Sequence, residues 1–121
     1  MAELFFFEQG AEPRPPYEVR IERVTAVPYV DGRRVKLQLV LTPFLERPSL
    51  DIEVVNAAGQ SVATVDILET MTPTMDLTVH LRGPQPEGEH RLLVRLYYGE
   101  APPQDVHELS FEIAAPGVVQ P

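Results

Sequence analysis

Serine and cysteine are the side chains that most often act as nucleophiles in enzymes. The chain has three serines and no cysteine. Ser49 precedes a predicted strand, Ser61 follows a turn, and Ser110 lies on the outer face of a predicted strand. None of them stands in a Gly-x-Ser-x-Gly pattern, which places a catalytic serine on a sharp strand-to-helix turn. The sequence therefore predicts no catalytic residue and no enzyme activity.

Metal binding needs ligands at suitable spacings, and His80, His90 and His107 form no His-x-His or His-x₃-His pair. Acidic side chains are numerous, but no segment has the closely spaced Asp/Asn ladder with a glycine that binds calcium. Nothing marks two carboxylates as buried, so hydrolysis by a pair of acids is not indicated. We expect a solvated acidic face, with no metal and no cofactor.

An aromatic run near the start is the strongest candidate for binding a partner. Phe5, Phe6 and Phe7 follow one another outside the strand pattern, so one apolar face is exposed unless another surface covers it. Burial of such a side chain is worth about 1.5–3 kcal/mol. A Pro-rich spacer, residues 12–16, favours an extended chain between this run and the first strand. The run predicts docking on a protein partner or on a second copy, as a homodimer, or packing on its own domain.

Two weaker sets of side chains are candidates for binding small ligands. A carbohydrate or another small ligand needs exposed aromatic rings that converge, and the candidates are Tyr29, Tyr97 and Tyr98. A carboxylate or phosphate needs a local basic patch, and the candidates are Arg33, Arg34, Arg47 and Arg82. The sequence does not show that either set converges, and scattered solvated arginines are the simpler interpretation.

Length and charge exclude several classes of protein. The 121 residues include 10 Lys and Arg against 18 Asp and Glu, a net charge of −8. Nucleic acid and anionic membranes repel such a chain, so we expect neither as a partner. No segment has the roughly 20 apolar residues that span a bilayer, and the start lacks a positively charged leader. Together with the absent cysteines and the preference for Arg over Lys, this favours a cytoplasmic protein of a bacterium or archaeon.

The elements that must position these side chains are strands. Thirteen prolines are spread along the chain and leave no apolar stripe with helical period that is long enough for a helix. Apolar and polar residues alternate instead, and Tyr17, Val19 and Ile21 are expected to share one face. The alternating segments are residues 17–28, 35–41, 50–55, 62–67, 75–81, 92–96 and 109–113. About seven short strands of this kind predict an all-β, antiparallel sandwich of two sheets.

Turn residues divide the chain between these strands. Asp31-Gly32 predicts a type I′ hairpin turn, because both residues tolerate a positive φ, and Gly59 suits a left-handed position in the next hairpin. The longer segment 43–48 predicts a crossing from one sheet to the other. We expect an aromatic and Pro-rich segment over residues 1–16, the sandwich domain over 17–114, and a tail over 115–121.

One segment carries a family resemblance. Gly88-x-His90-x-Leu92-x-Val94-x-Leu96-Tyr97 resembles the sixth strand of bacterial immunoglobulin-like and fibronectin type III-like sandwiches, in which a glycine leads a Tyr-rich alternating strand. The chain lacks the cysteine pair and the tryptophan of antibody domains, and His90 stands where a tyrosine is usual. The resemblance implies an immunoglobulin-like strand order, in which His80 lies in the opposite sheet from His90 and His107. It implies no activity.

Two classes of function follow from these observations. The favoured one is a non-enzymatic β-sandwich module that acts through protein–protein contact, by self-association. The alternative is a β-sandwich that binds a small ligand or a carbohydrate. A concave pocket lined by Tyr97, Tyr98 and polar groups would favour ligand binding, whereas a flat contact through an edge strand would favour self-association.

Overall fold

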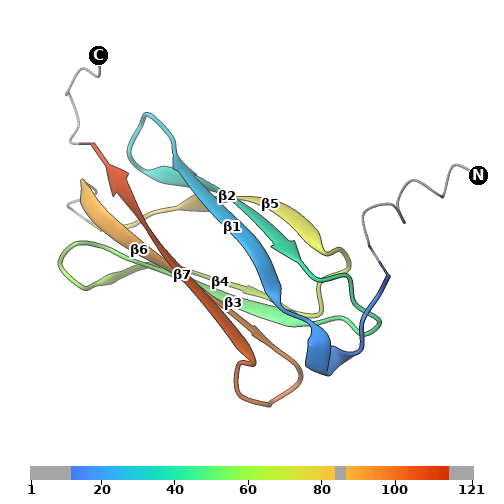
Figure 1. The fold of residues 1–121 in the computed structure, drawn as a ribbon. Helices are drawn as coiled ribbons and strands as arrows, with labels where there is room; N and C mark the ends of the chain where they lie inside the picture. The colour runs from blue at the N-terminus through green and yellow to red at the C-terminus, as the bar shows by residue number, and fades with distance from the viewer. Residues whose placement is uncertain (1–11, 84–86, 115–121) are drawn as a thin grey trace, which may run out of the picture.

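The structure is a computed structural model that describes residues 12–83 and 87–114. Seven strands form two antiparallel sheets that face each other (Figure 1). The first sheet has the order β1-β2-β5, with β1 (Ile21–Pro28), β2 (Arg34–Leu41) and β5 (Thr74–His80). The second has the order β4-β3-β6-β7, with β4 (Ser61–Ile67), β3 (Ser49–Val55), β6 (Gly88–Tyr97) and β7 (Asp105–Ile113). The predicted two-sheet antiparallel sandwich is confirmed.

The core lies between the two sheets, where the alternation of the sequence places it. Every second residue of the central strands β2, β3 and β6 is buried. The inward apolar side chains are Val35, Leu37, Leu39, Leu41, Leu50, Ile52, Val54, Leu92, Val94 and Leu96. Removing an apolar side chain of this size from water is worth about 1.5–3 kcal/mol, so the facing rows hold the two sheets together.

The chain enters the first strand later than the alternation predicts. Tyr17 does not share the inner face with Val19 and Ile21, because it lies in a turn of 3-10 helix, η1 (Pro16–Glu18), and is 72% exposed. Proline suits the first position of such a turn, since its fixed φ is helical and its nitrogen needs no partner. The expectation that Tyr17 points into the core is therefore wrong.

The first hairpin also differs from its prediction. Gly32 has a φ of 69°, but Asp31 has no positive φ, so the turn is not type I′. The Asp31 carboxylate instead accepts a hydrogen bond from the backbone N–H of Arg33 at 2.9 Å, which closes the turn locally. Two other turn predictions are confirmed: Gly59 has a φ of 84°, and residues 43–48 cross between the sheets.

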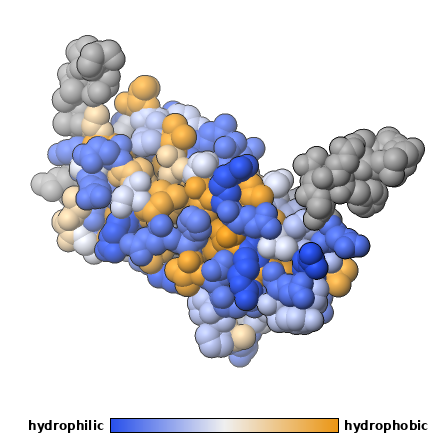
Figure 2. Space-filling model, in the orientation of Figure 1, coloured by the Kyte–Doolittle hydropathy of each residue, from blue (hydrophilic) through white to orange (hydrophobic). Residues whose placement is uncertain are grey.

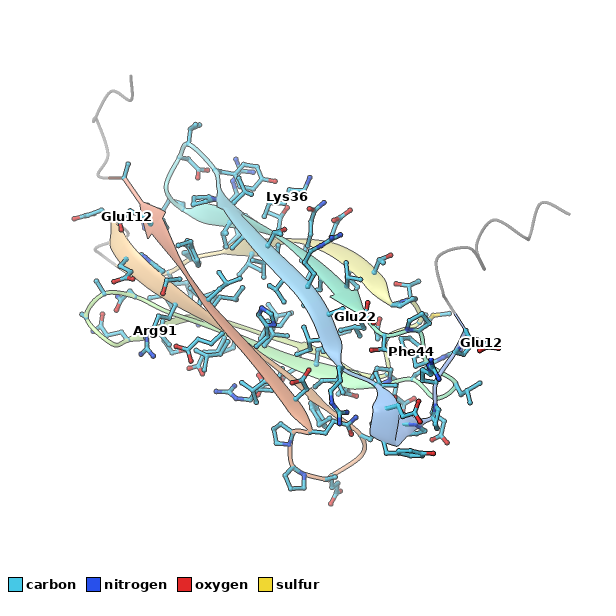
Figure 3. All side chains as sticks on the ribbon, in the orientation of Figure 1. Glu12, Glu22, Lys36, Phe44, Arg91 and Glu112 are labelled. Atoms are coloured by element: carbon cyan, nitrogen blue, oxygen red, sulfur yellow. The ribbon has the colours of Figure 1, made fainter. Side chains whose placement is uncertain are left out.

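Because paired strands are antiparallel, the connections between strands lie at two opposite ends of the sandwich. The crossover end holds η1 and the connections 19–20, 42–48, 68–73 and 98–104. The hairpin end holds the connections 29–33 and 56–60 and the described residues 81–83 and 87 between β5 and β6. Figure 3 shows Glu12 and Phe44 together at the crossover end and Glu112 at the other end. The first and last described residues thus lie at opposite ends of the sandwich.

The segment before η1 is attached to the crossover end. Arg14 forms a parallel bridge with Phe44, in which the Arg14 N–H donates to Pro43 and the Leu45 N–H donates to Arg14, both at 2.9 Å. This attachment places the described residues that follow the aromatic run at the crossover end, while the predicted domain boundary at residue 16 stays a prediction. No helix within the described residues has the length and apolar content of a membrane span.

Candidate functional site

Three connections meet at the crossover end around a depression of about 520 Å³, called the Tyr98 depression below. It is lined by Glu46 and Arg47 from the β2–β3 connection, Ser49 at the start of β3, Glu69 from the β4–β5 connection, and Tyr98 and Gly99 after β6. Its volume lies within the range of about 300–1,000 Å³ that is usual for small-ligand pockets. Side chains far apart in the sequence therefore meet at one concave surface.

Hydrogen bonds fix the floor of this depression. The buried Ser49 hydroxyl accepts a hydrogen bond from the Glu69 N–H at 3.0 Å, and the Thr70 N–H donates to Pro48 at 2.9 Å. Glu69 is the one described non-glycine residue with a positive φ, 50°. A residue other than glycine, asparagine or aspartate rarely adopts this conformation, which persists where the surrounding structure imposes it. The two bonds to Ser49 and Pro48 supply that constraint.

Tyr98 forms one wall of the depression. Its ring packs against the core, and its hydroxyl donates a hydrogen bond to the Glu46 carbonyl at 2.9 Å. Burial, and next the negative charge of Glu46, raise the pKa of Tyr98 above its ordinary value. The phenol therefore stays protonated at neutral pH, and it keeps the 42–48 connection tied to the end of β6.

The charged groups of the depression face water. Glu46, Arg47 and Glu69 are exposed, and Arg47 forms no ion pair with another described residue. The guanidinium group offers five N–H donors, and the two carboxylates offer acceptors on the same surface. Such a set suits a ligand that carries both donors and acceptors, as hydroxyl groups do.

The three candidate tyrosines do not converge. Tyr98 lines the depression, whereas Tyr97 is paired with Ser49 at the end of β6 and, by alternation with the buried Leu96, points to the outer face of its sheet. Tyr29 lies at the hairpin end, where its hydroxyl is 3.2 Å from that of Thr78. The sequence missed Glu46, Ser49 and Glu69 as lining residues, because only the sheet topology brings them beside Tyr98.

The four candidate arginines are also divided between the two ends. Arg47 lies at the crossover end, while Arg33, Arg34 and Arg82 lie at the hairpin end. Arg34 stacks on the Tyr29 ring, 4.2 Å from its centroid, and its Nε donates to Asp31 at 2.8 Å.

The hydrogen bonds to Asp31 also shift the pKa of its carboxyl group. The hydrogen bond from the Arg33 N–H, and then the contact with the Arg34 side chain, lower the pKa of Asp31. The charge of Arg34 is thus already matched within the loop. The four arginines do not form a single anion-binding patch.

The histidines are arranged as the implied strand order requires. His80 lies in the three-stranded sheet, and His90 and His107 lie in the other. Within residues 12–83 and 87–114, no three or more His, Cys, Asp or Glu side chains are grouped so as to hold a metal ion. His90 is 1% exposed and stacks on Phe111, with ring centroids 5.4 Å apart. It is therefore a core residue.

Adding zinc or calcium is expected to leave the melting temperature of the protein unchanged. A metal that binds the folded state alone would raise it by mass action, and His80 lies in the opposite sheet from His90 and His107. Differential scanning calorimetry with and without each metal measures this. A saturable rise of several degrees that His107→Ala abolishes would contradict the prediction.

The aromatic candidates Phe5, Phe6 and Phe7 lie outside the described residues. Their proposed contact with a partner or a second copy therefore stays a prediction. The structure places Arg14, which follows them in the chain, beside Phe44 at the crossover end.

Comparison with known proteins addresses the fold. No protein-family model matches the chain, and no curated protein matches it in sequence. Among solved structures, a glycosyl hydrolase family 2 member from Bacteroides cellulosilyticus is similar at 17% sequence identity with a TM-score of 0.56, and the match covers 78% of this chain and 15% of that chain. The β-glucuronidase of Bifidobacterium dentium gives 15% identity and a TM-score of 0.60, covering 81% and 18%. The similarity is one of fold.

At these levels of sequence identity, the similarity shows a common fold and does not show a common activity. The match is consistent with the immunoglobulin-like sandwich that the sequence indicated. The chain spans less than a fifth of the length of these glycosidases.

Proposed function

We propose that the chain is a non-catalytic β-sandwich module that binds a carbohydrate at the Tyr98 depression. The observation that carries this proposal is the meeting of an aromatic ring, a guanidinium group and two carboxylates around a concave surface with a fixed floor. The depression includes Tyr98 but not Tyr97, so it corresponds to part of the ligand-binding hypothesis from the sequence.

The chemistry of the depression suits a sugar ring. A pyranose has C–H groups on its faces and hydroxyl groups around its edge, and a tyrosine ring offers an apolar surface for the former. Arg47 and the carboxylates of Glu46 and Glu69 can each form two hydrogen bonds with neighbouring hydroxyls. The similar solved structures support the class of ligand, since both are described as glycosidases.

The carboxylates argue against catalysis at this site. Glycoside hydrolysis uses a pair of acids, one of which is kept protonated by its surroundings until it donates its proton. Glu46 and Glu69 are both exposed to water, so neither has the buried, apolar surroundings that such an acid uses. No Asp or Glu among the described residues is buried. Hydrogen bonding to the sugar is therefore the role we assign to both.

Ligand binding is tested by titrating the protein with methyl glycosides of glucose, galactose, mannose, xylose and glucuronic acid. We expect saturable NMR shifts for at least one sugar at the amides of Ser49, Glu69 and Gly99. Arg47→Ala and Tyr98→Ala are expected to weaken that binding by about tenfold or more, which corresponds to about 1.4 kcal/mol. Tyr98→Phe retains the ring and is expected to bind nearly normally.

Tyr29→Ala is the matched control, because it removes a tyrosine at the opposite end of the sandwich. It is expected to leave the affinity unchanged. Shifts that map to Tyr29 instead, or no saturable shift with any of the five sugars, would refute binding at the Tyr98 depression.

Protein contact is the second candidate function, and a specific observation favours it. The edge strands β4 and β5 each pair with a single described neighbour, which leaves main-chain groups available to another chain.

A further inference from the structure

The two sides of the sandwich differ in how the sheets are joined. Figure 2 faces the side of β1 and β7, where apolar side chains are visible between the strands. There the Ile21 N–H donates to the Asp105 carboxylate at 2.8 Å, and Gly32 lies against Ile113. Specific contacts therefore tie the sheets together at both ends of this side.

The opposite side carries a groove of about 330 Å³ between β4 and β5, called the β4–β5 groove below. Its lining residues are Ala63, Thr64, Val65, Thr78, Val79, His80 and Arg82. One hydrogen bond crosses its end, from the Arg82 N–H to Val62 at 2.9 Å. Both walls are edge strands, so an extended segment can enter and hydrogen-bond to their main chains.

The groove is basic at one end. His80 and Arg82 line it there, and the Arg33 guanidinium lies beside them, donating to the Gly83 carbonyl at 3.1 Å. None of its described lining residues is acidic, although the whole chain has a net charge of −8. The groove thus favours a segment with apolar side chains and flanking negative charge.

The chain itself contains such a segment. Residues 3–8 read Glu-Leu-Phe-Phe-Phe-Glu, an apolar run between two glutamates. We infer that residues 3–8 of one copy lie as an added strand in the β4–β5 groove of a second copy. In an extended strand, alternate side chains of the run face the groove, and Glu8 lies at its basic end.

Chain length favours a second copy over the same domain. Arg14 is held beside Phe44 at the crossover end, whereas the basic end of the groove is at the other end of β5, about 20 Å away at about 3.3 Å per residue. The five residues between Glu8 and Arg14 allow the chain to span about that distance only when it is fully extended. A second copy imposes no such limit, and a two-fold pair satisfies both grooves at once.

Sedimentation equilibrium of the full chain over a range of concentrations tests this inference. We expect a dimer, and a monomer when Phe5→Ser, Phe6→Ser and Phe7→Ser are combined. A labelled peptide of residues 1–12 is expected to bind this triple variant, which also shows that the groove is folded. Arg82→Glu is expected to weaken dimerisation by about tenfold or more, while the control Arg91→Glu, on the outer face of the other sheet, leaves it within about twofold.

Two results would overturn the inference. One is a dimer that the triple variant and Arg82→Glu leave unchanged, because the contact would then lie elsewhere. The other is a monomeric full chain, including one in which the phenylalanines protect β5 amides from hydrogen exchange, since the segment would then cover its own domain. Neither result depends on sugar binding at the Tyr98 depression.

Discussion

Leu39→Ala is expected to lower the free energy of unfolding by about 2–5 kcal/mol, the cost usual for truncating a buried leucine. Leu39 lies in the middle of β2, the central strand of its sheet, and is 1% exposed. Its side chain faces the opposite sheet, so its loss leaves a cavity between two layers that cannot close independently. Urea denaturation of the wild-type and variant proteins measures the difference.

Gln38→Ala is the matched control on the same strand. Gln38 points to the outer face, where it accepts a 3.4 Å hydrogen bond from Thr25, and its replacement is expected to cost no more than about 0.5 kcal/mol. Equal losses at both positions would contradict the assigned inner face of β2 and, with it, the register of the strand, because face and register are linked.

The success of the fold prediction has a local cause. In β2 and β6 each apolar residue is followed by a polar or less buried one, and this period belongs to a strand whatever its neighbours are. Residues 43–48 lack that period and carry two prolines, which makes them unsuitable for a tight hairpin between adjacent strands. Strand number and the change of sheet could therefore be predicted without long-range information.

The errors arise where the alternation ends. Tyr17 continues the period of Val19 and Ile21, yet the prolines before it set a 3-10 turn that rotates it into solvent. At Asp31, a side-chain hydrogen bond decides the backbone conformation, and composition alone does not distinguish it from a type I′ turn. Both outcomes depend on competition between local conformations of similar energy.

The candidate site was less predictable than the fold. Tyr98 could be named as a candidate from its type, but Glu46 and Glu69 come from connections on either side of β3 and β4. Their meeting depends on the order of strands in both sheets, which the sequence indicates only through a resemblance. The strain at Glu69 has no sequence signal, because glutamate is not a residue that favours positive φ.

The burial of His90 is a different case, because the alternation of β6 alone is sufficient to predict it. Gly88, His90, Leu92 and Val94 occupy alternate positions of β6, so the inward face includes the histidine. Histidine is less often fully buried than leucine or valine, so the residue type alone does not indicate a core position. In the structure its Nδ1 donates a hydrogen bond to the Gly88 carbonyl at 3.0 Å, which meets the polar demand of a buried imidazole.

His90→Ala is accordingly expected to destabilise the protein by about 3 kcal/mol, near the lower end for removing a buried aromatic ring. The change removes the stacking on Phe111 and the hydrogen bond to Gly88 together. His90→Phe keeps a ring of similar volume and is expected to cost less than about 1.5 kcal/mol. His80→Ala, on an exposed position of β5, is expected to stay within about 0.5 kcal/mol.

Thermal and urea unfolding of these three variants distinguishes a role of His90 in the core from a role as a metal ligand. If His90 serves the core, stability follows ring volume, so alanine is much worse than phenylalanine and added zinc changes neither variant. A loss as small for His90→Ala as for His80→Ala would mean that the ring does not fill the space beside Phe111. Since Leu92, Val94 and Leu96 follow His90 on the same face, that result would also put the inward face of β6 in question.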